Sequence, residues 1–182
     1  MVSDEELAYQ LQRGSEEALE QLVNRYHAPI HAYILRMSGD YHATHDLVQD
    51  VFIKVCRGIK YYRQGFPFKA WLYSIASNTY KDYKKTAYVR KVLPGLGETE
   101  SCAGHIATPE EVLLKDYERT RVLDAINGLG DIYRETLILR FYQELKLNEI
   151  AVILNIPLGT VKSRLSSSVA QLKEILAVKE VL

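Results

Sequence analysis

Residues 60–91 of the chain mix aromatic and basic side chains, a combination with a chemistry of its own. The aromatic residues are Tyr61, Tyr62, Phe66, Phe68, Trp71, Tyr73, Tyr80, Tyr83 and Tyr88, and the basic ones are Lys60, Arg63, Lys69, Lys81, Lys84, Lys85, Arg90 and Lys91. Basic groups neutralise phosphates while aromatic rings stack on unpaired bases, so the segment predicts binding to single-stranded nucleic acid. The competing interpretation is burial in a core. The residues for which we favour burial are Phe68, Trp71, Leu72 and Ile75, and those expected to be exposed are Tyr61, Tyr62 and Tyr80.

Residues 147–176 have the spacing of a helix-turn-helix. A short apolar helix containing Ile150 and Leu154 is followed by a turn at Pro157 and then by a longer helix. The polar side chains near the start of the longer helix, away from its apolar stripe, are Thr160, Lys162, Ser163, Ser166 and Ser167. Such groups can donate to the phosphates and base edges of duplex DNA. The alternative is a plain packing helix with a solvated polar face.

Three polar residues, Asp46, Gln49 and Asp50, share one face of a predicted helix because they lie at positions i, i+3 and i+4. The opposite face carries the apolar residues of that helix, including Val48 and Val51. The acidic patch would suit a basic protein partner. A solvated acidic face is the alternative.

A metal-dependent hydrolase is a less favoured interpretation of the same helix. His42, His45 and Asp46 fit a His-x-x-His-Asp pattern. The sequence lacks a further convergent cluster of histidines and carboxylates, a glycine-rich phosphate loop and a nucleophile elbow. We therefore predict that the protein is not an enzyme and has neither a metal nor a cofactor.

The elements that must position these groups carry mostly helical sequence patterns. The alternation of apolar and polar residues that is typical of a strand is almost absent. The N-caps Ser3 and Ser15 predict the starts of the first two helices. Pro29 is expected to kink or divide the second helix. A third helix is expected to weaken or end at Gly58, and a fourth to follow Pro67. The sequence therefore predicts an all-α fold.

A break in the helical pattern divides the chain into two small helical domains. Residues 91–108 carry Pro and Gly among Thr, Ser and Glu without an apolar period, which is typical of a flexible linker. The first domain is then 1–90. The second, 109–182, restarts with a capping box at Thr108 to Glu111.

The near-neutral overall charge conceals an asymmetry along the chain. The 182 residues include 23 basic and 23 acidic side chains, and the 47% hydrophobic content is ordinary for a globular protein. Residues 1–53 hold nine acidic and three basic groups, whereas residues 54–91 hold ten basic groups and one acidic group. This pattern favours a polyanion partner for the basic part. The longest uncharged run, 150–161, is too short to span a bilayer. Because Cys56 and Cys102 match no disulfide or metal spacing, we expect a cytoplasmic protein.

Three segments resemble bacterial RNA polymerase sigma factors of the extracytoplasmic-function (ECF, group 4) type. Residues 46–54, Asp-Leu-Val-Gln-Asp-Val-Phe-Ile-Lys, resemble the core-binding helix of region 2.2. Residues 68–78, Phe-Lys-Ala-Trp-Leu-Tyr-Ser-Ile-Ala-Ser-Asn, resemble the promoter-melting helix of regions 2.3 and 2.4. Residues 149–165 resemble the helix-turn-helix of region 4.2, most clearly in Gly-Thr-Val-Lys-Ser-Arg at 159–164. The match covers both predicted domains in the right order.

The resemblance implies a role for each group of polar residues. Binding to core polymerase is implied for Asp46, Gln49 and Asp50. Receiving an extruded base of the minus-ten element is implied for the loop that contains Lys60, Tyr61, Tyr62, Arg63 and Phe66, with Asn78 near the duplex edge of that element. Contact with the minus-35 element is implied for Lys162, Ser163 and Arg164, to which the polar face of the helix adds Thr160 and Ser167.

One departure from the family pattern concerns the minus-35 helix. The family commonly has basic residues after the Gly-Thr-Val-Lys-Ser-Arg-Leu phrase, whereas this chain has Ser166, Ser167 and Ser168. Because phosphate contacts would be lost, we expect minus-35 binding by the second domain to be weaker and less sensitive to salt.

The resemblance also implies the partners of the chain. We expect an alternative sigma factor that binds core RNA polymerase and directs transcription initiation on promoter DNA, both duplex and melted. The family pattern implies a cognate anti-sigma protein, which is often membrane-bound and would then hold the chain at the membrane. A stand-alone helix-turn-helix regulator of transcription is the main rival.

Overall fold

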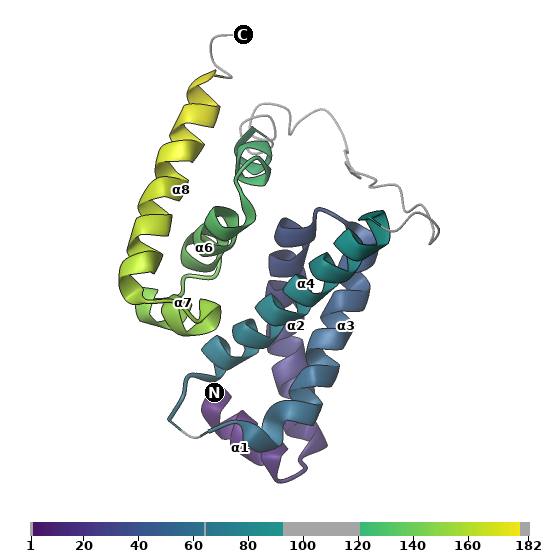
Figure 1. The fold of residues 1–182 in the computed structure, drawn as a ribbon. Coiled ribbons are helices and arrows are strands. Elements are labelled where there is room, and N and C mark those ends of the chain that lie inside the picture. Colours follow the sequence, from purple (N-terminus) through teal and green to yellow (C-terminus); the bar gives the residue numbers. More distant parts are fainter. Residues whose placement is uncertain (1, 64, 93–120, 179–182) are drawn as a thin grey trace, which may run out of the picture. The chain divides into compact units, whose positions relative to one another are not determined.

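The computed structural model describes residues 2–63, 65–92 and 121–178, and the regular structure within these ranges is helical throughout (Figure 1). The helices form two compact units. The first unit contains α1 (Asp4–Gln12), α2 (Glu16–Ser38), α3 (Tyr41–Gly58), the 3-10 turn η1 (Ile59–Tyr61) and α4 (Phe68–Val92). The prediction of an all-α fold is confirmed. Most of the predicted linker, and the predicted helix start at Thr108, lie outside the described residues.

The first three helices begin at side chains that cap them. The Oγ atoms of Ser3 and Ser15 accept hydrogen bonds from backbone N–H groups three residues later, at 3.2 Å in each case. Asp40 Oδ1 accepts from the Ala43 N–H at 3.0 Å. These caps satisfy amide groups that the first turn of a helix leaves unpaired. Both serine caps are as predicted from the sequence.

Pro29 does not divide the second helix, so of the kink or division expected there, the division is wrong. α2 runs unbroken from Glu16 to Ser38. A proline inside a helix removes one backbone hydrogen bond and costs about 3 kcal/mol. The side chains of Tyr26, Ile30 and Tyr33, on either side of the proline, are buried in the core. Tertiary packing of this face keeps the helix continuous.

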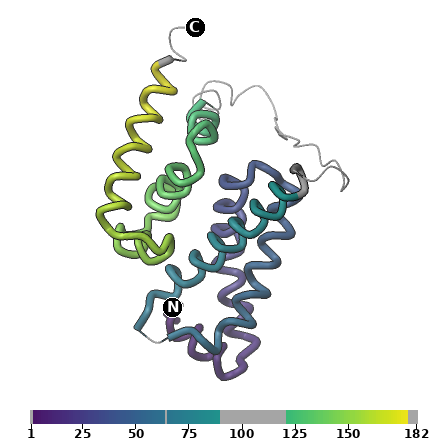
Figure 2. Tube along the Cα trace, in the orientation of Figure 1, coloured from purple at the N-terminus to yellow at the C-terminus, as the bar shows by residue number. Residues whose placement is uncertain are grey.

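The core of the first unit surrounds α2, which packs against α1, α3 and α4 (Figures 1 and 2). The rings of Tyr33 and Tyr73 meet edge to face there, with their centroids 5.4 Å apart. Burial raises the pKa of the Tyr73 hydroxyl well above its ordinary value. α1 lies at the end of the bundle where α3 leads into η1, and it contacts both η1 and α4. This position brings α1 next to the aromatic loop singled out above.

The C-terminal helices, here called the second unit, are a helical stretch over residues 121–127 and then α6 (Asp131–Phe141), α7 (Leu147–Leu154) and α8 (Leu158–Val178). α6 packs against α8. Ile138, Ile150 and Val161, one from each helix, are fully buried. The short helix, tight turn and long helix predicted from the sequence are therefore present.

Candidate functional site

The loop of residues 60–66, here called the 60–66 loop, presents one aromatic ring to solvent. The side chain of Tyr61 is 74% exposed. The Lys60 Nζ atom lies 5.0 Å from the centroid of that ring. An ammonium group over an exposed ring offers a base a stacking surface and a phosphate a counter-charge. The pair has the chemistry predicted for the segment.

Tyr62 and Tyr80 are buried, so the expectation that they are exposed is wrong. Tyr62 is 5% exposed and its ring packs against Phe68 and Trp71, with centroids 5.8 Å and 5.3 Å away. Its hydroxyl donates to the Phe66 carbonyl. Burial, and then the carboxylates of α1, raise its pKa. Tyr62 therefore supports the loop from inside and does not offer a ring to a base.

The hydroxyl of Tyr80 donates to the Met37 carbonyl of α2 at 2.8 Å. That hydrogen bond satisfies the polar end of a ring that is otherwise in the core. Among the four residues expected to be buried, Phe68 and Leu72 are buried, whereas Trp71 and Ile75 are half-buried.

The remaining predicted residues of this surface lie on the loop and on α4. Arg63 is exposed and Phe66 is half-buried. Gly65 has a φ of +86°, a conformation that residues with a Cβ atom rarely adopt, and it lets the chain turn back toward α4. Asn78 is exposed on α4, about 15 Å along the helix from Phe68 at the usual rise per residue.

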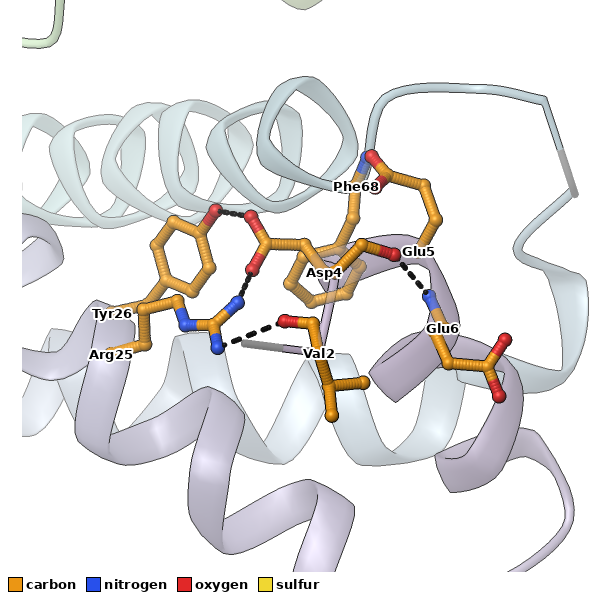
Figure 3. A network of polar contacts seen from close by, with 8 residues as sticks. Val2, Asp4, Glu5, Glu6, Arg25, Tyr26 and Phe68 are labelled. Carbon is orange, nitrogen blue, oxygen red and sulfur yellow. Dashed lines mark hydrogen bonds and ion pairs between the residues drawn. The ribbon is translucent and has the colours of Figure 1, made fainter.

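α1 is a contributor that we did not predict for this surface. Asp4 accepts hydrogen bonds from Arg25 and Tyr26 of α2, and the Glu5 Oε1 atom accepts from the Phe68 N–H at 3.3 Å (Figure 3). Burial and the hydrogen bond to Asp4 raise the pKa of Tyr26 above its ordinary range. These contacts join residues that lie 21 to 63 positions apart in the sequence, so no local pattern indicated them.

The acidic face of α3 is open to solvent as predicted. The side chains of Asp46, Gln49 and Asp50 are all exposed. Gln49 Nε2 lies 3.2 Å from His45 Nε2, within hydrogen-bonding distance. Asp50 also lines a shallow groove of about 250 Å³ between α3 and α4, together with Lys54 and Asp82. The face therefore offers carboxylates to a basic partner.

The metal-site alternative gains no support from the geometry. His42, His45 and Asp46 are all exposed on α3. Within the described ranges, no group of three or more His, Cys, Asp or Glu side chains is placed to hold a metal ion. The side chain within hydrogen-bonding distance of His45 is the amide of Gln49, not a further histidine or carboxylate.

The helix-turn-helix presents the predicted polar residues at the start of α8. Lys162 and Ser163 are exposed, and Thr160, Arg164 and Ser167 are half-buried. Asn155, with a φ of +52°, turns the chain between α7 and α8. The Ser163 hydroxyl donates to the Thr160 carbonyl at 3.0 Å. The exposed cation and hydroxyl lie within one turn of the helix, where they can approach phosphates and base edges together.

Ser168 is a packing residue, so it was wrong to group it with Ser166 and Ser167 as a lost phosphate contact. Its side chain is 0% exposed. Its hydroxyl lies 3.0 Å from the Tyr133 carbonyl of α6 and 2.6 Å from the Arg164 carbonyl. A basic residue could not reach DNA from this position. The predicted loss of phosphate contacts therefore applies to Ser166 and Ser167 alone.

Family models match both units of the chain. The model for sigma-70 region 2 matches residues 22–88, and the model for sigma-70 region 4 matches residues 119–172. The chain is 31% identical over 169 residues to the RNA polymerase sigma-H factor of Pseudomonas aeruginosa, covering 89% of this chain and 88% of that protein. It is 32% identical over 173 residues to the ECF RNA polymerase sigma-E factor of Escherichia coli, covering 90% and 89%.

Solved structures resemble the fold. The sigma factor RpoE of Bartonella quintana, crystallised with the anti-sigma factor NepR, has a TM-score of 0.70 and 28% identity, covering 87% of this chain and 96% of that one. CnrH, solved with the cytosolic domain of CnrY, has a TM-score of 0.73 over 96% of this chain and 97% of that one. At 22% identity, the likeness to CnrH bears on the fold alone.

Proposed function

This chain belongs to the ECF group of bacterial RNA polymerase sigma factors, and we propose that it binds core polymerase through α3 and opens promoter DNA with the 60–66 loop. Sigma factors are transcription initiation factors, and this chain is an alternative sigma factor that directs transcription initiation. The observation that carries the proposed division of roles is the exposed Lys60–Tyr61 pair within the region 2 match.

The core-binding role belongs to the acidic face of α3. Asp46, Gln49 and Asp50 are exposed, and they come from a helix whose other side is packed against α2 and α4. A carboxylate face of this kind attracts a basic partner and fixes its register. We assign the clamp helices of core polymerase as that partner.

The melting role belongs to the 60–66 loop and to α4. Tyr61 would stack on an extruded base of the minus-ten element while Lys60 and Arg63 neutralise the adjacent phosphates. Phe66 would close one side of the base site. Asn78, farther along α4, would meet the edge of the remaining duplex. Polymerase performs the covalent chemistry, so this surface needs only to bind the opened strand.

The minus-35 role belongs to α8. Lys162 and Ser163 are exposed at its N-terminal end, beside Thr160, Arg164 and Ser167. A recognition helix of a helix-turn-helix enters the major groove with this end. The positive end of the helix dipole adds to the attraction for phosphates.

An anti-sigma protein is the proposed inhibitor, because the RpoE relative was crystallised with one. The described residues contain no helix long and apolar enough to cross a bilayer. We propose that the chain works in the cytoplasm and that any attachment to the membrane comes from this inhibitor.

The direct test is co-elution of the purified chain with Escherichia coli core RNA polymerase in size-exclusion chromatography. The holoenzyme would then select promoter DNA from a random-sequence duplex pool and start run-off transcription on it. Stoichiometric co-elution with transcription would support the proposal. Specific duplex binding by the chain alone, without co-elution, would instead favour a stand-alone helix-turn-helix regulator.

A further inference from the structure

We propose that α1 positions the 60–66 loop for its base, with Gln12 as the positioning residue at one end of the loop and Glu5 at the other. The inference rests on the proposed function and adds to it a helix that lies outside the region 2 match, which begins at residue 22. Neither residue touches DNA in this account. Gln12 acts on the backbone on both sides of Lys60 and Tyr61, and Glu5 acts on the backbone at the start of α4.

Gln12 fastens the start of the loop. Its Nε2 atom donates to the Ile59 carbonyl at 2.8 Å and to the Tyr62 carbonyl at 2.7 Å. Both partners can only accept hydrogen bonds, so the amide nitrogen must face them. These two carbonyls flank the Lys60–Tyr61 pair. One side chain therefore holds the backbone on both sides of the exposed ring.

Glu5 fastens the end of the loop. Its Oε1 atom accepts from the Phe68 N–H, which belongs to the first residue of α4 (Figure 3). The first amide groups of a helix have no partner inside that helix, and a carboxylate near them is favoured by the helix dipole. Glu5 thus caps α4 from a different helix and fixes where the loop ends.

α1 is itself anchored firmly enough to serve as a support. Leu7 and Ala8 are fully buried. Asp4, one residue before Glu5, is bonded to Arg25 and Tyr26 of α2 (Figure 3). Because α1 is fixed on α2, its hydrogen bonds hold both ends of the 60–66 loop in place relative to α2.

Preorganisation is what this support would contribute to DNA binding. A loop that is already held in its bound conformation loses less conformational entropy when it captures a base. The buried Tyr62 fills the inside of the loop, while Gln12 and Glu5 fix its ends. Without Gln12, Tyr61 would still be present but would sample positions that do not meet the base.

Gln12→Glu tests the inference, because a carboxylate of the same length cannot donate to the two carbonyls. The matched control is Gln10→Glu, the same change on the same helix at a residue that bonds to Glu6 within α1. The probe is the promoter DNA selected by the wild-type holoenzyme, opened as a mismatch bubble. Each unpaired base of its minus-ten strand is replaced in turn by an abasic site.

We expect the wild-type holoenzyme to bind the intact bubble more tightly than the DNA that lacks the captured base. Gln12→Glu should reduce this preference about fivefold to thirtyfold, the equivalent of one or two net hydrogen bonds. Gln10→Glu should keep it. Gln12→Met, which is similar in length and uncharged but also lacks a donor, should behave like Gln12→Glu and serves if the carboxylate impairs folding.

A folded Gln12 variant that keeps the wild-type preference for the intact base would overturn the inference while leaving the proposed function standing. Failure of the wild-type chain to co-elute with core polymerase would overturn the proposed function, and the role of α1 with it. Equal co-elution of wild type, Gln12→Glu and Gln10→Glu would support a role confined to the loop.

Discussion

Tyr61 and Tyr62 are adjacent in the chain, yet their side chains face opposite environments. The ring of Tyr61 is open to solvent beneath an ammonium group, whereas the ring of Tyr62 is packed between Phe68 and Trp71. The 3-10 turn η1 ends at Tyr61, and the backbone becomes extended at Tyr62, which separates the two directions. Removal of the Tyr61 ring should therefore affect DNA binding, whereas removal of the Tyr62 ring should affect stability.

Tyr61→Ala should change thermal stability by no more than about 0.5 kcal/mol, as is usual for an exposed side chain. It should weaken binding of the holoenzyme to bubble DNA by about 1–3 kcal/mol, the usual value of one base stack. Tyr62→Ala should instead destabilise the first unit by about 3–5 kcal/mol because it empties a buried site. Fluorescence of Trp71, the single tryptophan, reports unfolding of this unit.

The control for the second variant is Tyr62→Phe, which keeps the ring and removes only the hydrogen bond to Phe66. It should cost about 1 kcal/mol. If Tyr61→Ala unfolded the first unit as readily as Tyr62→Ala, the assignment of Tyr61 as an open stacking surface would be wrong.

Asp50 provides a test of the protein-binding face. Asp50→Lys should lower the affinity for core polymerase at least about tenfold, because it places a cation against a basic partner. Glu20→Lys reverses an exposed charge on α2 and should leave that affinity unchanged. Titration of labelled chain with core polymerase measures both. Equal losses in the two variants would indicate that overall charge, and not the α3 face, governs binding.

At the scale of helices, the packing of α2 beside α3 sets the surroundings of the His31 side chain. His31 is half-buried on α2, and its ring meets Tyr41 of α3 at a centroid distance of 5.8 Å. Burial, followed by the neighbouring His27 and His45, lowers its pKa below the ordinary value of 6.5. The unfolded chain therefore takes up a proton at His31 at a higher pH than the folded chain does.

Because of this difference, the free energy of unfolding of the first unit depends on pH. Between the two pKa values the unfolded state binds more protons, so the free energy of unfolding contributed by His31 falls as the pH drops below about 6.5. Urea unfolding followed by Trp71 fluorescence from pH 8 to pH 5 should show this loss. His31→Phe, which keeps a ring against Tyr41, should flatten the slope. An identical slope in both proteins would contradict the account.

α8 carries neighbouring serines with different surroundings. Ser167→Arg should leave stability unchanged and add one phosphate contact, so the slope of log K against log salt should become steeper by about 0.9. Ser168→Arg should destabilise the second unit by about 3 kcal/mol, since it places a long charged side chain in a fully buried site packed against α6. Holoenzyme binding to the selected promoter and loss of helical circular dichroism measure the two effects. Unchanged affinity and slope in Ser167→Arg would contradict the first.

The helices could be predicted from the sequence where a residue acts on residues close to it in the chain. Ser3 and Ser15 accept hydrogen bonds from backbone N–H groups three residues later, and the period of the apolar residues indicated the buried face of α3. The division expected at Pro29 was wrong because a local preference was outweighed by packing from other helices. Gln12 was missed because its partners lie 47 and 50 residues farther along the chain. Contacts of that range leave no periodic signal.

At the scale of the whole chain, charge is divided rather than balanced. Residues 1–53 carry six more acidic than basic groups, and residues 54–91 carry nine more basic than acidic groups. At an ionic strength of about 10 mM the Debye length is about 30 Å, so the acidic part weakens the attraction of the basic part for DNA. A basic partner covering α3 would remove part of this opposition. The chain alone should therefore be a poor DNA-binding protein at low salt.

Neutralising two carboxylates should raise nonspecific binding of the free chain to duplex DNA several-fold at about 10 mM salt, wherever in residues 1–53 they lie. Two double variants test this, Asp46→Asn with Asp50→Asn, and Glu16→Gln with Glu20→Gln. Both should bind a labelled random-sequence duplex more tightly than wild type, and the gain should shrink at about 150 mM salt, where the Debye length is about 8 Å.

Binding to core polymerase separates the two double variants. The change at Asp46 and Asp50 should impair it, whereas the change at Glu16 and Glu20 should not, because only the first pair lies on the α3 face. Tighter DNA binding in the first pair alone would mean that the α3 face contacts DNA directly. Suppose instead that both double variants bind DNA more tightly and that only the variant at Asp46 and Asp50 loses polymerase. The repulsion of DNA would then come from the total charge of residues 1–53, and the recognition of polymerase from Asp46 and Asp50.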